Sequence, residues 1–90
     1  MRRGSKMARI DNTAKALIAY AKSLGFDYET VNATFDGVLV WGTTAICVDW
    51  KSKNGTLTPT QQRLVARGFP IRFIQTPAQI DALRSELMKP

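Results

Sequence analysis

The sequence predicts a single α/β domain in which helices flank a mixed four-stranded sheet, in the order αβββαβα. Three observations predict it. An amphipathic repeat opens the chain, two apolar segments then follow with only Gly42-Thr43 between them, and two Thr-Pro-x-Gln motifs begin later helices. Ninety residues are enough for one hydrophobic core and too few for two.

The first helix is expected over residues 11–25. Asp11 is among its capping residues, and Leu17, Ala21 and Leu24 recur at the spacing of one helical face. Gly25 is expected just after its last turn, where a left-handed residue ends a helix. Strands are expected over residues 26–32, 36–41 and 44–50, and the last two form a tight hairpin.

The second half of the chain begins with a polar loop over residues 51–56. Thr58-Pro59-Thr60-Gln61 predicts a helix that ends near Gly68, and residues 70–75 form a fourth strand. Thr76-Pro77-Ala78-Gln79 begins the last helix. The helical crossover adds the fourth strand to three antiparallel ones, which makes the sheet mixed.

The composition excludes several kinds of chemistry. The chain has no histidine and a single cysteine, Cys47, so Ser-His-Asp triads, Cys-His pairs, His-ligated zinc and an intrachain disulfide are excluded. A metal would have to be a hard cation held by oxygen atoms, which indicates Mg²⁺ or Mn²⁺.

The charge indicates a polyanionic partner, most often nucleic acid, because the net charge is +6 and the pI about 10. No apolar run is long enough to cross a membrane, and no secretory signal is recognisable. Residues 1–8, which include Arg2 and Arg3, are expected to be a basic arm or leader before a domain over residues 9–90.

A candidate site follows from the geometry of the hairpin. Side chains alternate along a strand, so Asp49 and Lys51 share one face and Trp50 takes the other. Residues equidistant from the Gly42-Thr43 turn lie opposite each other, which places Asp36 opposite Asp49. Facing carboxylates repel, and a divalent cation between them would remove that cost.

This site would take its metal ligands from Asp36, Asp49 and the backbone carbonyl of Trp50. Lys51 would orient or deprotonate a water molecule, or neutralise charge at a scissile phosphate. The alternative is structural. Asp36 would then be a turn residue, and Asp49 and Lys51 the solvated end of a strand.

Other candidates also have two interpretations. The capping box explains Gln61 fully, so its spacing does not indicate catalysis. Trp50 is expected to pack in the core or on the sheet, and Cys47 to act as a small apolar residue. Four basic residues are either solvated surface or phosphate contacts; they are Lys53, Arg63, Arg67 and Arg72.

The order of three motifs resembles the PD-(D/E)xK nuclease superfamily, in particular the small VRR-NUC domains of phage and prophage proteins that are similar to Holliday junction resolvases. The motifs are FDGVLV at residues 35–40, ICVDWK at 46–51 and LTPTQ at 57–61. The resemblance covers about residues 9 to 88 and implies a restriction-endonuclease-like core. Phe35 stands where the family usually has proline, and Asp49 where it more often has glutamate.

The resemblance implies that Asp36 and Asp49 bind the metal and that Lys51 and Gln61 are catalytic residues. It implies a homodimer that cuts branched DNA in the cytoplasm of a bacterial host or phage-infected cell. DNA contacts are expected from basic residues of the arm, the loop and the second helix; they are Arg2, Arg3, Lys53, Arg63 and Arg67. The other hypotheses are a catalytically degenerate DNA-binding module and a basic protein-interaction domain.

Overall fold

The computed structural model describes residues 4–31, 33–52 and 54–89, and for residues 4–12 it describes the backbone alone. In this part of the chain the order is αβββαβα, which confirms the predicted arrangement. The elements are α1 (Gly4–Ser23), β1 (Asp27–Thr30), β2 (Gly37–Trp41), β3 (Thr44–Trp50), α2 (Pro59–Ala66), β4 (Ile71–Ile74) and α3 (Pro77–Met88).

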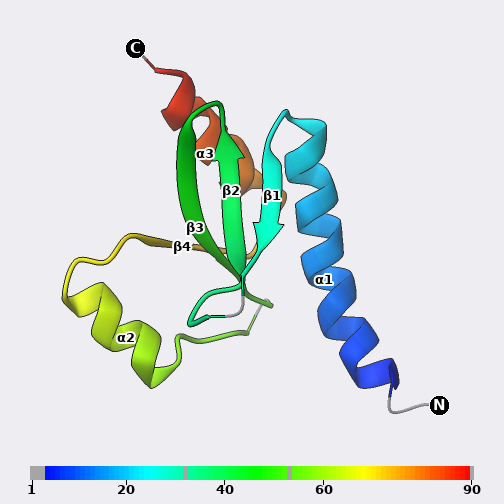
Figure 1. Cartoon of the computed structure of the whole chain (residues 1–90). Coiled ribbons are helices and arrows are strands. Elements are labelled where there is room, and N and C mark those ends of the chain that lie inside the picture. The colour runs from blue at the N-terminus through cyan, green and yellow to red at the C-terminus, as the bar shows by residue number, and fades with distance from the viewer. Residues whose placement is uncertain (1–3, 32, 53, 90) are drawn as a thin grey trace.

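The strands form one sheet in the order β1-β2-β3-β4. The first three are antiparallel, and β4 pairs with β3 in parallel, so the predicted mixed sheet is confirmed. In Figure 1, α3 lies behind the sheet, α1 runs beside β1, and α2 stands apart at the lower left. The crossover that contains α2 therefore brings the chain back to the sheet without lying flat against it.

Helix α1 begins at Gly4, well before the predicted start at Asp11. The intervening sequence has no proline and several good helix formers, so nothing in it stops the helix. Residues 4–8, assigned to an arm or leader from the sequence, thus belong to α1. The helix ends as predicted: Gly25 has φ +108°, and the N–H groups of Gly25 and Phe26 donate to the carbonyls of Lys22 and Ala21.

The two faces of the sheet differ. Paired residues share a face, and side chains alternate along each strand. Leu39, Val48 and Ile74 therefore lie together on the face that carries the core. Helices α1 and α3 cover this face with buried side chains; they are Leu17, Ala21, Ile80 and Leu83. The opposite face carries Val38, Val40, Cys47 and Phe73, which are half-buried and belong to no part of that core among the described residues.

Among the described residues, no helix has both the length and the apolar character that crossing a bilayer requires.

Candidate metal and phosphodiester site

The hairpin has the predicted register. Gly42, the first turn residue, has φ +62°, and a tight primed hairpin turn requires a positive φ at this position. Gly37 pairs with Val48, as expected for a turn at Gly42-Thr43. The paired register ends at Gly37 and Val48, and the N–H of Asp36, just beyond it, donates to the carbonyl of the same Val48 at 3.1 Å. The backbone of Asp36 therefore departs from the regular ladder, and its carboxyl group, not a backbone pair, brings it to Asp49.

A close contact fixes the backbone beside Asp36. A Cβ atom on Gly37 would meet the Tyr28 hydroxyl at 2.2 Å and the Glu29 carbonyl at 2.5 Å, so only glycine fits there. The same hydroxyl accepts a hydrogen bond from Trp50 Nε1 at 3.1 Å. Gly37 thus lets the aromatic pair of Tyr28 and Trp50 approach the end of the hairpin.

Two groups lie against the Asp36 carboxyl group, and one of them, the Trp50 N–H, stabilises its charge. Its Oδ2 accepts the backbone N–H of Trp50 at 2.9 Å, and its carboxyl group contacts that of Asp49 closely enough to share a hydrogen bond. Asp49 itself is buried, with 6% of its surface exposed. The two carboxylates therefore converge from adjacent strands, one exposed and one buried.

The environment raises the pKa of the Asp36 carboxyl group. Partial loss of water around the carboxyl group is the main cause, although the residue as a whole is exposed. The neighbouring Asp49 carboxylate adds to it, whereas the Trp50 N–H and the Lys51 charge lower that pKa. The carboxyl pair thus carries an electrostatic cost that the local contacts only partly offset. A divalent cation between the two groups would remove it.

Lys51 lies next to this pair. Its ammonium nitrogen is 2.9 Å from Asp49 Oδ2, and it also donates to Gln61 Oε1 at 3.0 Å. The Phe73 ring, on the same face of the sheet, lies 5.9 Å from the nitrogen. Three side chains thus hold one positive charge at the carboxylate pair.

Gln61 has two roles at once. It completes the capping box of α2, since its Oε1 accepts the Thr58 N–H at 3.1 Å and its own N–H donates to Thr58 Oγ1 at 3.1 Å. Its Nε2 also donates to the Thr34 carbonyl at 2.8 Å, and only 3% of the residue is exposed. The capping role predicted from the sequence is confirmed, and the contact with Lys51 adds to it.

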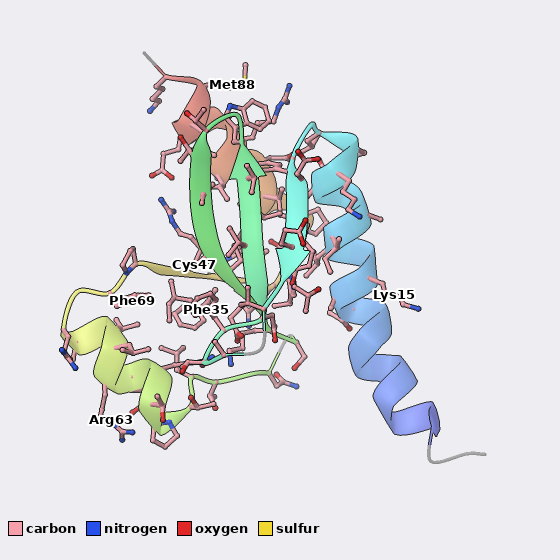
Figure 2. All side chains as sticks on the ribbon, in the orientation of Figure 1. Lys15, Phe35, Cys47, Arg63, Phe69 and Met88 are labelled. Carbon is pink, nitrogen blue, oxygen red and sulfur yellow. The ribbon has the colours of Figure 1, made fainter. Side chains whose placement is uncertain are left out.

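Aromatic packing fixes α2 near the site. The Phe35 ring lies 6.0 Å from the ring of Phe69, which follows the end of α2, and Figure 2 shows the two side by side. Phe35 directly precedes Asp36. Phe35 therefore helps to hold the helix that carries Gln61.

The remaining predicted residues divide into four groups. Trp50 is buried in the core, as expected, and its side chain does not join the carboxylates. Arg63 and Arg67 are exposed on and just after α2, and Arg63 points away from the sheet in Figure 2. Arg72 lies on the core face of the sheet and pairs with Glu86 at 2.5 Å, so it does not join the site. The predicted DNA contacts Arg2, Arg3 and Lys53 lie outside the described residues.

Sequence reasoning did not find Thr34, Tyr28 or Gly37 as supports of the site. Gly37 had a signal, because a glycine inside a strand next to a candidate ligand indicates close approach of another group. The Thr34 carbonyl and the Tyr28 hydroxyl had none, since both contacts depend on how distant segments pack.

The donor set suits a hard cation. In a strand, the N–H and C=O of one residue point to the same side. Because the Trp50 N–H donates to Asp36, the Trp50 carbonyl also points to the side of Asp36. Two carboxylates and one carbonyl are the oxygen ligands that Mg²⁺ and Mn²⁺ accept.

Comparison with known proteins found no matching family model, no matching curated protein and no matching solved structure.

Proposed function

We propose that this chain is a Mg²⁺- or Mn²⁺-dependent DNA endonuclease with a restriction-endonuclease-like core, selective for branched DNA such as a Holliday junction. The observation that carries the proposal is the convergence of Asp36 and Asp49 with Lys51, whose nitrogen lies 2.9 Å from Asp49. The net charge of +6 supports a polyanionic substrate.

The chain's own residues have distinct roles in this proposal. Asp36, Asp49 and the Trp50 carbonyl would hold the cation, which when bound lowers the pKa of a water molecule and polarises the phosphate. Lys51 supplies positive charge where the scissile phosphate gains negative charge in the transition state. Gln61 keeps the Lys51 amine beside the carboxylates, and this makes it a positioning residue.

Cleavage of a four-way junction, a flap and a linear duplex of equal length with Mg²⁺ or Mn²⁺ tests the proposal. The unaltered protein should cut, and Asp49→Asn and Lys51→Ala should each lower the rate by at least about 100-fold. Circular dichroism should show that both variants fold. Equal rates for variants and parent would contradict the assignment.

The same experiment identifies the alternative. Salt-sensitive binding of DNA, without cleavage of any substrate and without dependence on metal, would mean a DNA-binding module on a degenerate nuclease scaffold. Calorimetric titration with Mn²⁺ separates the two hypotheses independently of cleavage, because only the nuclease needs the cation. Absence of both DNA and metal binding would favour a protein-interaction domain.

We also propose that the chain acts as a homodimer. Cutting both strands of a junction takes two sites, and the chain offers one such carboxylate pair among its described residues. The half-buried apolar side chains on the face of the sheet opposite α1 and α3, among them Val40 and Phe73, offer a surface for a second copy. Light scattering should give the mass of two chains, and Val40→Glu should shift it to one. A parent protein with the mass of one chain would contradict the dimer.

A further inference from the structure

A pocket opens beside the candidate site, on the side of α1. Its volume is about 620 Å³, within the range of ligand-binding pockets. Its lining includes Ala14 and Ile18 of α1, the aromatic residues Tyr28 and Trp50, and two residues of the candidate site, Asp36 and Lys51. The pocket therefore adjoins the site through Asp36 and Lys51, whereas Asp49 lies on the other face of the sheet and does not line it.

The lining of this pocket matches the chemistry of a nucleoside. The aliphatic and aromatic walls suit the flat, apolar faces of a base, and the Thr30, Ser52 and Thr56 side chains bring hydroxyl groups for its polar edge or the sugar. Lys15 also borders the pocket, but its amine points away from the sheet in Figure 2. Among the described lining residues, the charges close to the site are thus those of Asp36 and Lys51.

The aromatic wall is rigid before any ligand binds. The Tyr28 and Trp50 rings lie 5.6 Å apart, and the hydrogen bond from Trp50 Nε1 to the Tyr28 hydroxyl joins them. Gly37 leaves the space that this hydroxyl occupies, since a Cβ atom there would lie 2.2 Å from it. A preformed wall costs little entropy when a base packs against it.

We propose that this pocket binds one unpaired nucleoside of the DNA strand, next to the phosphate held at Asp36, Asp49 and Lys51. The proposal rests on the proposed function and names the feature of the substrate that the site selects. A base in a duplex must leave its stack to enter, at a cost of a few kcal/mol that an unpaired base does not incur. The pocket thus gives a physical basis for preferring branched DNA to continuous duplex.

Filling the pocket tests this inference. Thr30 is exposed, lies in β1 and lines the pocket, so Thr30→Trp fills it without disturbing the core. The matched control is Thr44→Trp, which makes the same change at an exposed strand position beside the hairpin turn, at the opposite end from Asp36. Both variants leave the net charge unchanged.

Binding is measured by fluorescence anisotropy in EDTA, so that no cleavage takes place. The probes are a duplex with a single-stranded flap and the same duplex without the flap. The parent protein and Thr44→Trp should bind the flap at least about 10-fold more tightly, and Thr30→Trp should abolish that ratio while keeping its affinity for the duplex. A parent without the preference, or an unchanged ratio in Thr30→Trp, would overturn the inference.

The readout separates this inference from the nuclease proposal. If the parent cleaves DNA but Thr30→Trp keeps the binding ratio, the pocket assignment is wrong and the nuclease stands. If the parent cleaves no DNA but prefers the flap, and Thr30→Trp abolishes that preference, the pocket binds an unpaired nucleoside and the nuclease assignment is wrong.

Discussion

The starts of α2 and α3 have nearly the same local sequence and very different surroundings. Each begins with Thr-Pro-x-Gln, and in each the glutamine Oε1 accepts the N–H of the threonine, at 3.1 Å. Gln79 is exposed, and its second contact is with the N–H of Gln75. Gln61 is buried and contacts Lys51 and the Thr34 carbonyl.

The difference shows that a motif can fix a helix start without fixing a function. The capping contact is local, so it forms wherever these residues occur in this order. The contact between Gln61 and Lys51 depends on the Phe35–Phe69 packing and on the loop between β3 and α2. The two helix starts therefore form a matched pair. Both have the capping contact, but the carboxylate site lies beside the start of α2 and not beside that of α3.

The largest expected effect contrasts Gln61→Ala with Gln79→Ala. Gln61→Ala should lower the rate of junction cleavage by about 10- to 100-fold, because Lys51 loses the group that holds it, whereas Gln79→Ala should change it less than about 2-fold. Gln61→Ala should also lower the free energy of unfolding by about 1–3 kcal/mol, since the Thr34 carbonyl and Lys51 lose a buried partner.

Single-turnover cleavage, at a temperature where circular dichroism shows both variants folded, measures the first effect, and urea unfolding measures the second. A loss confined to stability would mean that Gln61 only caps the helix. Equal losses of cleavage in the two variants would mean that Lys51 needs no partner from α2.

A smaller effect is expected from Thr58→Ala, which removes the cap and keeps the glutamine. The free energy of unfolding should fall by about 1 kcal/mol, because the Gln61 N–H loses its partner at the helix start. Cleavage by the folded protein should remain within about 3-fold of the parent, since Gln61 still contacts Lys51 and Thr34. Urea unfolding and cleavage of the same preparation measure both; a loss as large as that of Gln61→Ala would show that the cap itself holds the site.

The smallest effect is electrostatic and concerns the end of the sheet beside α2. Because the pKa of Asp36 is raised above its usual 3.8, the folded protein keeps this proton to higher pH than the unfolded chain. Ionisation of Asp36 therefore lowers the free energy of unfolding as pH rises through the raised pKa. Without metal, Asp36→Asn should stabilise the protein at about pH 7 and have no such effect at about pH 3.

Asp36 is exposed and water screens its charge, so the gain should stay below about 1 kcal/mol. The control is Asp27→Asn in β1, another exposed carboxylate, which should leave stability nearly unchanged. Thermal unfolding with and without Mn²⁺ measures both, and Mn²⁺ should stabilise the parent and not Asp36→Asn. A loss of stability in metal-free Asp36→Asn at about pH 7 would show that the hydrogen bond to Trp50 outweighs the repulsion.

Much of the fold and half of the site follow from the sequence by itself. The αβββαβα order, the mixed sheet and both helix caps depend on short-range patterns, as does the hairpin register that brings Asp36 and Asp49 to the same end of the sheet. A two-residue turn and the alternation of side chains leave a hairpin only one register, so these predictions need no knowledge of the rest of the chain.

The tertiary structure decided which distant groups meet. It placed Gln61 against Lys51 and Thr34, turned Arg72 toward Glu86 on the other face, and left a pocket between α1 and the end of the hairpin. These outcomes depend on how helices pack on the sheet, which is a property of the whole core. Local periodicity determines which side of an element a residue occupies, and only packing determines what lies on that side.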